Sequence, residues 1–147
     1  MKRIQGWGNK NTDYPVPEPA RQYLDRVVGT PHQISNTPLE DLIRKVPESN
    51  LPEHPLITTN AEERLRHARG QSLNDWVDMY DGLVNTFPDG VAYPKTDDDL
   101  RDLIRFAETH RLNLIPYGGG SSVVGHLTPP EEGPPTLCVD LAKLNQF

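Results

Sequence analysis

Apolar residues in the first 85 positions recur at helical spacing, within short and separate segments. Residues 19–28 carry apolar side chains at i, i+3, i+4, i+7 and i+8, and Gly29 is a suitable stop, so they predict a helix. Further helices are expected after the capping residues Thr37, Thr59 and Ser72. The last of these helices should share one apolar face, formed by Leu73, Trp76, Val77 and Tyr80. Residues 47–57 contain several prolines and read as a loop.

The pattern changes near position 86, where short continuous apolar runs replace the helical period. Runs at 91–94, 112–116 and 136–141 predict three strands. Between the first two runs, Thr96 caps an amphipathic helix whose first turn is acidic, as the helix dipole favours. Strand, helix and strand form a βαβ unit, so the first two strands should run parallel. The fold class is α/β in this part and α+β overall. A helical N-terminal arm over 1–85 precedes a β-α-β-β portion over 86–147.

A glycine-rich loop follows the second predicted strand. Three consecutive glycines free the backbone to adopt positive φ, so that successive amides can point into one anion-binding concavity. The Rossmann dinucleotide fingerprint is excluded because position 123 is valine, and the Walker loop because no lysine lies between Lys95 and Lys143. On this sequence alone, a tight turn between strands is the competing interpretation. The candidate binding residues are Pro116, Tyr117, Gly118, Gly119, Gly120, Ser121 and Ser122.

Charge and composition exclude several other functions. The net charge of −6 disfavours nucleic-acid binding, which requires clustered basic residues. Arg64, Arg66 and Arg69 alternate with acids and are interpreted as a solvated helix face. The single cysteine, Cys138, lies in an apolar run and reads as a small buried hydrophobe, which suits a reducing cytoplasm. No segment has transmembrane length, and the N-terminus lacks a signal-peptide pattern.

Neither a metal site nor a catalytic group can be recognised by spacing. The three aspartates at 97–99 are interpreted as a helix start, and the five histidines show no ligand spacing. No acid, base or nucleophile stands in a pattern that indicates catalysis.

A family resemblance links these pieces. Pro88-Asp89-Gly90-Val91-Ala92-Tyr93-Pro94, a helix, Pro116-Tyr117-Gly118-Gly119-Gly120-Ser121-Ser122 and an apolar strand ending in Asp140-Leu141 occur in this order. The order resembles the opening of the FAD-binding domain of the vanillyl-alcohol oxidase / p-cresol methylhydroxylase superfamily. Gly6-Trp7-Gly8 and the segment 66–73 are similar to the branch that contains alkyl-dihydroxyacetonephosphate synthase and bacterial FAD-linked oxidases.

The resemblance implies that residues 116–122 wrap the FAD pyrophosphate, with amides from the glycines and hydroxyls from the serines. Many relatives carry a histidine linked covalently to the flavin where Ser121 stands. The resemblance therefore implies non-covalent FAD, and His126, just beyond the loop, is not expected to replace that anchor.

The expected function is the FAD-binding part of a flavoenzyme that acts on a small molecule. In the family, the catalytic residues and the substrate domain lie downstream of the matched region, so this chain alone is expected to be inactive. Synthase chemistry of the alkyl-dihydroxyacetonephosphate synthase type is one alternative to oxidation. A non-catalytic truncated module and a small anion-binding domain unrelated to flavin are the alternatives of another class. Because the predicted sheet is incomplete, we also expect self-association.

Overall fold

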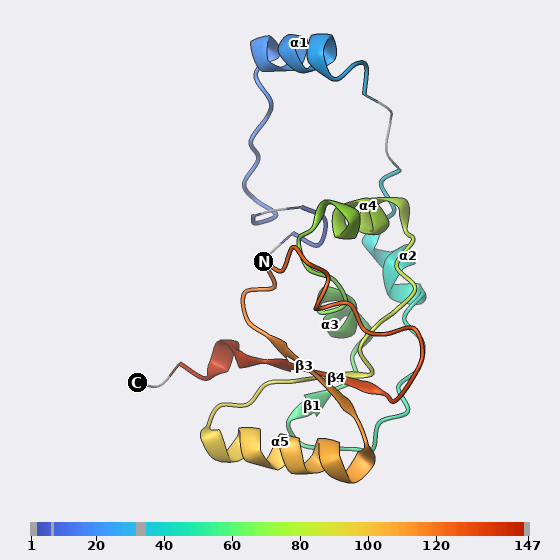
Figure 1. Ribbon diagram of the computed structural model, residues 1–147, viewed down its shortest axis with the longest axis vertical. Coiled ribbons are helices and arrows are strands. Elements are labelled where there is room, and N and C mark those ends of the chain that lie inside the picture. The colour runs from blue at the N-terminus through green and yellow to red at the C-terminus, as the bar shows by residue number, and fades with distance from the viewer. Residues whose placement is uncertain (1–2, 7, 32–34, 146–147) are drawn as a thin grey trace.

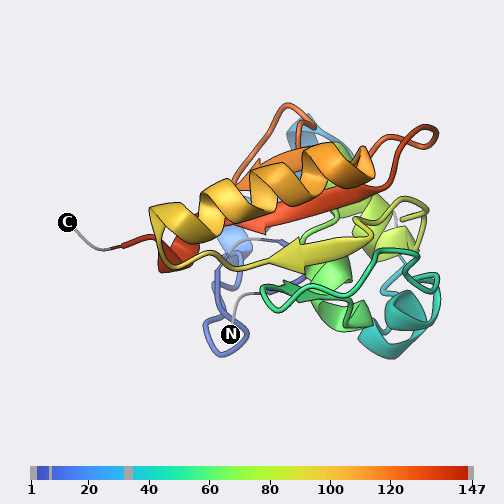
Figure 2. The ribbon, with the colours of Figure 1, turned by 90° about the horizontal axis from the view of Figure 1, so that it is seen from below.

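A computed structural model describes residues 3–6, 8–31 and 35–145, and it shows helices on both faces of one sheet (Figure 1). The 14-residue helix α5, Asp97–His110, covers one face. Helices α2 (Leu39–Arg44), α3 (Ala61–Arg66) and α4 (Leu73–Asp81) of the N-terminal arm lie on the other side of the sheet (Figure 1), and the view from below shows α5 in front of the strands (Figure 2). Trp7 of the Gly6-Trp7-Gly8 motif and the residues at 1–2, 32–34 and 146–147 lie outside the described residues.

The sheet has four strands in the order β1-β2-β4-β3. The strands β2 (Gly90–Ala92) and β3 (Asn113–Tyr117) both run parallel to β4 (Thr136–Asp140), which lies between them. The first two predicted strands are therefore parallel, as expected, but they are not neighbours. All five residues of β4 are buried, which fits its central position.

The fourth strand, β1 (Ile57–Thr58), pairs antiparallel with β2 and comes from the arm. Its segment was expected to be a loop up to residue 57. Two residues are too few to show an alternating pattern, so the sequence alone could not reveal this strand.

The helix α5 begins and packs as its sequence predicts. Thr96 and Asp99 form a capping box, with the Asp99 amide donating to the Thr96 hydroxyl at 3.1 Å. Its buried stripe includes Leu103 and packs in one cluster with Ala92, Leu137 and Val139 of the sheet. The three aspartates at 97–99 thus open a helix, as expected.

The arm has its own apolar core, supplied by three short helices. These are α2 (Leu39–Arg44), α3 (Ala61–Arg66) and α4 (Leu73–Asp81). Leu42, Leu65 and Met79 of these helices form a buried cluster with Ala68 and Val84, which follow α3 and α4.

The caps of these three helices agree only in part with the sequence. Ser72 and Asp75 form the capping box of α4, and Gly82 ends that helix with φ +69°. The cap of α3 is Asn60 and not Thr59, because the Asn60 side chain accepts the Glu63 amide at 3.1 Å. The helix α2 has Pro38 in the cap position with no side-chain hydrogen bond, so the expected role of Thr37 was wrong.

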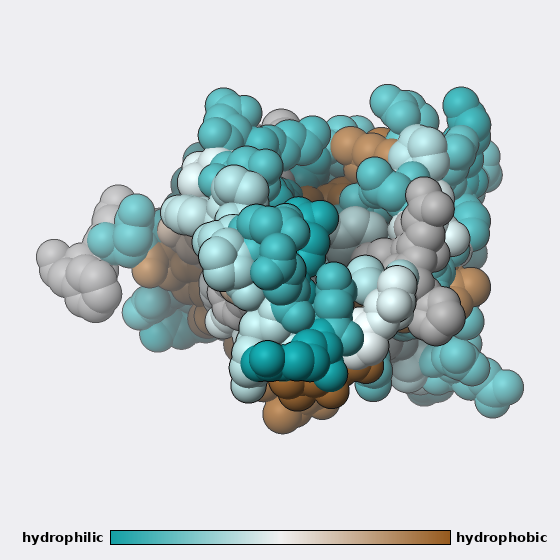
Figure 3. Space-filling view, turned by 90° about the horizontal axis from the view of Figure 1, so that it is seen from above, coloured by the Kyte–Doolittle hydropathy of each residue, from teal (hydrophilic) through white to brown (hydrophobic). Residues whose placement is uncertain are grey.

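The helix α1 (Glu18–Val27) stands apart from the body of the molecule (Figure 1) and buries none of its residues. Its apolar stripe faces solvent, with Val27 and Val28 60% and 78% exposed. The predicted apolar face of α4 was also wrong: Leu73 is 73% exposed, whereas Met79 is buried. Figure 3, which looks onto α1, shows apolar side chains open to solvent on this side of the molecule. No helix among the described residues is long and apolar enough to cross a bilayer.

Candidate functional site

The glycine loop lies at the carboxyl ends of the parallel strands β3 and β4, the edge where open α/β sheets bind ligands. Gly118 and Gly119 are exposed, and Gly120 is buried with φ +71°. A β-carbon on Gly120 would lie 2.1 Å from the Tyr117 hydroxyl oxygen. Only glycine fits there, because the tyrosine side chain folds under the loop.

Tyr117 connects the loop to the arm. Its side chain packs against the His67 ring with 4.3 Å between ring centroids, and its hydroxyl donates to the Arg66 carbonyl at 3.5 Å. Burial raises the pKa of Tyr117 to about 12, so the phenol is neutral at physiological pH. Tyr117 therefore packs beneath the loop as a neutral side chain.

The arm also contacts the far end of the loop. The Gln71 backbone amide donates to the Ser122 carbonyl at 2.6 Å. A β-carbon on Gly70 would lie 2.3 Å from that same oxygen, so glycine is required on the arm side as well. The Ser122 hydroxyl lies 2.9 Å from Nδ1 of the exposed His126, which therefore contacts the loop through a side-chain hydrogen bond.

A buried His–Asp pair fixes the arm against the end of β4. Nε2 of His67 lies 3.1 Å from an Asp140 carboxylate oxygen, and Nδ1 lies 2.7 Å from the Glu63 carbonyl. These two contacts hold the ring between the end of α3 and the end of β4, beneath the loop.

A cavity of about 330 Å³ lies between the arm, the loop and the end of β4. It is the concave space onto which the glycine loop opens. Residues of the three segments line it together, among them Arg3, Arg66, His67, Gly119, Gly120 and Asp140.

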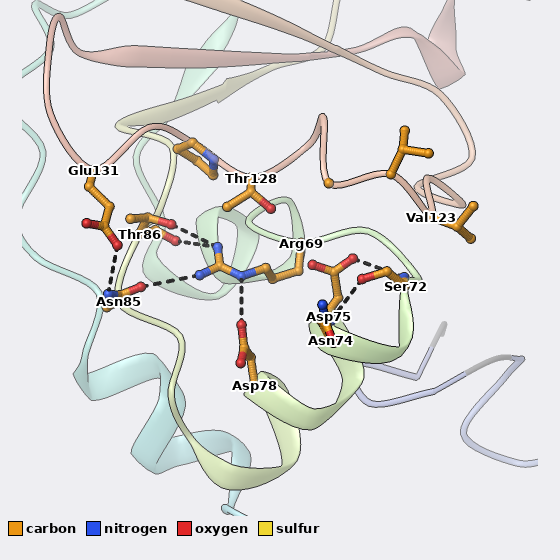
Figure 4. A pocket seen from close by; sticks show the side chains of 13 residues that line it. Arg69, Ser72, Asn74, Asp75, Asp78, Asn85, Thr86, Val123, Thr128 and Glu131 are labelled. Atoms are coloured by element: carbon orange, nitrogen blue, oxygen red, sulfur yellow. Dashed lines mark hydrogen bonds and ion pairs between the residues drawn. The ribbon is translucent and has the colours of Figure 1, made fainter.

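A second pocket, of about 500 Å³, lies on the other side of Arg69 (Figure 4). The Arg69 guanidinium donates to the Thr86 carbonyl at 3.0 Å and to the Thr86 hydroxyl at 2.9 Å. Burial lowers its pKa, an effect opposed by Asp78 and Asp75. With Glu131 these aspartates make three acids against one arginine, so this pocket repels anions.

Two arginines contradict the expected solvated helix face. Arg64 is 2% and Arg69 6% exposed. Arg64 donates to the carbonyls of Pro88 and Pro47 at 2.7 and 2.6 Å. Sequence spacing missed this because the acceptors are backbone carbonyls, which leave no mark in the pattern of side chains.

The remaining expectations concern metal and cysteine chemistry. The part of the chain described by the structure contains no group of three His, Cys, Asp or Glu side chains able to hold a metal. Cys138 is fully buried in β4, as expected, and burial raises its pKa to about 12.

Comparison with known proteins identifies this arrangement. Residues 88–147 match a family model described as an FAD binding domain. Alkyldihydroxyacetonephosphate synthase of Caenorhabditis elegans is 29% identical over 130 residues, which cover 88% of this chain and 20% of that protein. The mitochondrial D-lactate dehydrogenase [cytochrome] of Arabidopsis thaliana is 26% identical over 90 residues, covering 61% of this chain and 14% of that protein.

The fold agrees with that similarity. A solved structure of alkyldihydroxyacetonephosphate synthase superposes with a TM-score of 0.74 at 19% identity, covering 99% of this chain and 33% of that one. The match of residues 88–147 to the FAD binding domain agrees with the resemblance seen in the sequence. The chain contains a segment that matches an FAD binding domain, and it spans a fifth or less of the length of these curated relatives.

Proposed function

We propose that residues 116–122 hold the diphosphate of a non-covalently bound FAD, and that the chain serves as the flavin-holding part of a flavoenzyme. One observation carries this proposal: the glycine loop lies at the carboxyl edge of the parallel strands, within the segment that matches the FAD binding domain. In a loop at such an edge, successive backbone N–H groups can form a nest that stabilises a phosphate oxygen.

The residues present fit a diphosphate. A β-carbon on Gly118 would meet nothing within 4 Å, so the backbone there is open to close approach. Ser121 of the same loop is exposed and can add a hydroxyl donor. Two hydrogen bonds hold the loop against the arm, one from the Gln71 backbone amide and one from the Tyr117 hydroxyl. Because the loop is already ordered, a ligand loses less binding free energy to loop ordering.

The mode of attachment follows from side-chain chemistry. A serine hydroxyl does not form the flavin link that a histidine nitrogen forms, and Ser121 stands at the relevant position. His126, the histidine next to the loop, is hydrogen-bonded to Ser122. We therefore expect denaturation to release FAD into solution.

The reaction of the whole enzyme is proposed at the level of class. Bound FAD supplies two-electron redox chemistry, and the protein contributes binding and orientation. The similarity to a D-lactate dehydrogenase favours oxidation of a small hydroxy acid or alcohol. The similarity to alkyldihydroxyacetonephosphate synthase favours exchange of an acyl for an alkyl chain on a phosphorylated ketone. We expect the isolated chain to bind FAD without turning over either kind of substrate.

The test is a fluorescence titration of the purified chain with FAD. We expect saturable binding that the Gly119→Asp variant weakens at least tenfold, because the new carboxylate repels the diphosphate. Val28→Asp adds the same charge directly after α1, where the side chain is 78% exposed, and it should bind FAD like the wild type. Equal affinity of wild type and Gly119→Asp would show that the loop does not hold the diphosphate.

A further inference from the structure

Two helices of the arm expose apolar stripes to solvent. The stripe of α1 consists of Tyr23, Leu24 and Val27, which are 57%, 47% and 60% exposed. On α4, Leu73 and Val77 lie one turn apart on one face and are 73% and 39% exposed. Water is a poor solvent for both stripes, so each of them favours an apolar cover.

The charges beside the two stripes are complementary. On the helical period, Arg21 and Arg26 lie nearest to the stripe of α1, whereas Glu18 lies on the opposite face. The helix α4 has no basic residue, and Asp78 and Asp81 lie beside its stripe. Arg21 is 3.8 Å from Glu18, but both side chains are more than 60% exposed, so exchanging this partner for an aspartate of α4 costs little.

The segment that carries α1 begins and ends at the last turn of α4. At its start, the Gln5 side-chain amide donates to the Met79 carbonyl at 3.1 Å. At its end, the Thr37 backbone amide donates to the Tyr80 carbonyl at 3.0 Å. Both anchors therefore tie α1 to the helix that carries the second stripe.

The connections to α1 are long enough for it to reach α4. Residues 28–36 lead from α1 to its second anchor, and a connection of this length spans at most about 30 Å. On the other side, Asp13 is tied to Arg3, which lines a small cavity with Tyr80, and residues 14–17 then span up to about 16 Å. The helix α4 has nine residues and is about 14 Å long, so its whole length is within reach.

We propose that α1 is a strap that closes on α4 of the same chain, with Leu24 and Val27 packed against Leu73 and Val77. The arrangement in Figure 1, in which α1 stands apart, is then the open state of this strap. The residues on either side of Leu73 line the second pocket, so the closed strap lies at the rim of that pocket. This inference is independent of the proposed binding of FAD.

Disulfide trapping tests the closed state. The chain contains one cysteine, so Cys138→Ala provides a background without thiols. On this background, Val27→Cys with Val77→Cys places one thiol on each stripe. The matched control combines Gln22→Cys, on the opposite face of α1, with Val77→Cys. Both proteins are treated with oxidised glutathione and analysed on non-reducing gels at several protein concentrations, and circular dichroism reports whether each is folded.

We expect the Val27 variant to form a disulfide within one chain at least tenfold faster than the Gln22 variant, at a rate that does not depend on protein concentration. Equal rates for the two variants would overturn the proposal, because no face of α1 would then prefer α4. A disulfide formed mainly between chains would also overturn it, because α4 would then receive α1 of a second copy.

Limited proteolysis tests the same closure without new thiols. Trypsin can cleave α1 after Arg21 and Arg26, and a docked helix resists cleavage. Leu73→Asp puts a charge into the proposed contact and should speed this cleavage at least threefold. Ile104→Asp makes a similar change on α5, where the side chain is 42% exposed, and should cleave like the wild type. Wild-type cleavage of folded Leu73→Asp would show that α4 does not hold the strap.

Discussion

At the residue scale, the glycines in and around the loop differ in how much room there is for a side chain. A β-carbon on Gly120 would collide with the Tyr117 hydroxyl, and one on Gly70 would collide with the Ser122 carbonyl. Gly118, in contrast, has no atom within 4 Å of a built β-carbon. Glycine is therefore required by packing at positions 70 and 120 but not at position 118.

This difference predicts the effect of a single methyl group. Gly120→Ala should lower the free energy of unfolding by about 1–3 kcal/mol, because alanine disfavours φ +71° and its methyl collides with Tyr117. Gly118→Ala, the matched control, should stay within about 0.5 kcal/mol of the wild type. Urea denaturation measures both variants, and equal losses would contradict the packing described for Tyr117.

Two buried acids predict how stability depends on alkaline pH. Burial raises the pKa of Cys138 and that of Tyr117 to about 12, whereas the unfolded groups titrate near about 8.5 and 10. At pH values between the unfolded and the folded pKa, the folded state binds more protons than the unfolded state. The free energy of unfolding therefore falls as pH rises from about 9 to 12. Below about pH 8 these groups contribute no slope.

Cys138→Ala provides the check. Denaturation at successive pH values should show a shallower decline for this variant from about pH 9 to 10, where only the thiol separates the two proteins. The native thiol should also react slowly with a thiol reagent at pH 8, because it is protonated and fully buried. A fast reaction in the folded protein would contradict this environment.

At the scale of elements, the end of α3 meets the end of β4 through His67 and Asp140. Removing one partner leaves the other buried without its hydrogen bond, which costs about 1–3 kcal/mol. His67→Ala and Asp140→Asn should each lower the free energy of unfolding by this amount. The double variant should lose less than the sum of the two.

The exposed pair of Asp98 and Arg101 on α5 is the control for that cycle. Its side chains are 91% and 62% exposed, so breaking it should change stability by less than about 1 kcal/mol. Additive losses at His67 and Asp140 would show that the two do not interact across the boundary between arm and sheet.

The elements also show what a sequence can and cannot predict. The N-caps Ser72 and Thr96 were predicted correctly because each cap contacts an amide only three residues further along the chain. The apolar stripe of α1 was predicted as helical but not as exposed, since periodicity indicates a face and not what covers it. Buried Arg64 and Arg69 escaped prediction because their partners are distant backbone and side-chain oxygens.

The candidate site also has parts that the sequence predicts and parts that it does not. Family motifs located the FAD binding domain, since they are continuous in sequence, and the role of the loop in holding FAD stays a prediction. The contribution of the arm was not predictable, because the contact of Gly70 and Gln71 with Ser122 joins segments far apart in the chain.

At the scale of the whole molecule, the sheet has an open edge at β3. Leu114 on that strand is 38% exposed, and Ile104 of the covering helix is 42% exposed. An open edge with apolar neighbours favours pairing with another chain. The expectation of self-association remains a prediction, and this edge is where we place it.

Sedimentation velocity over a range of concentrations tests this prediction. Leu114→Lys should shift the chain toward monomer by at least threefold in apparent dissociation constant, because a charge is costly in an apolar contact. Val28→Lys introduces the same charge directly after α1, where the valine is 78% exposed, and should leave the β3 contact intact. If only Val28→Lys shifts the distribution, α1 and not the sheet edge mediates association.

The position of β4 has a consequence for protein synthesis. Its neighbours β2 and β3 leave the ribosome first, and neither pairs with the other in the finished sheet. Both must wait until residues 136–140 emerge and insert between them. During that interval, translation exposes two apolar strands with no parallel partner, and a pause before codon 136 would prolong the time in which a chaperone must shield them.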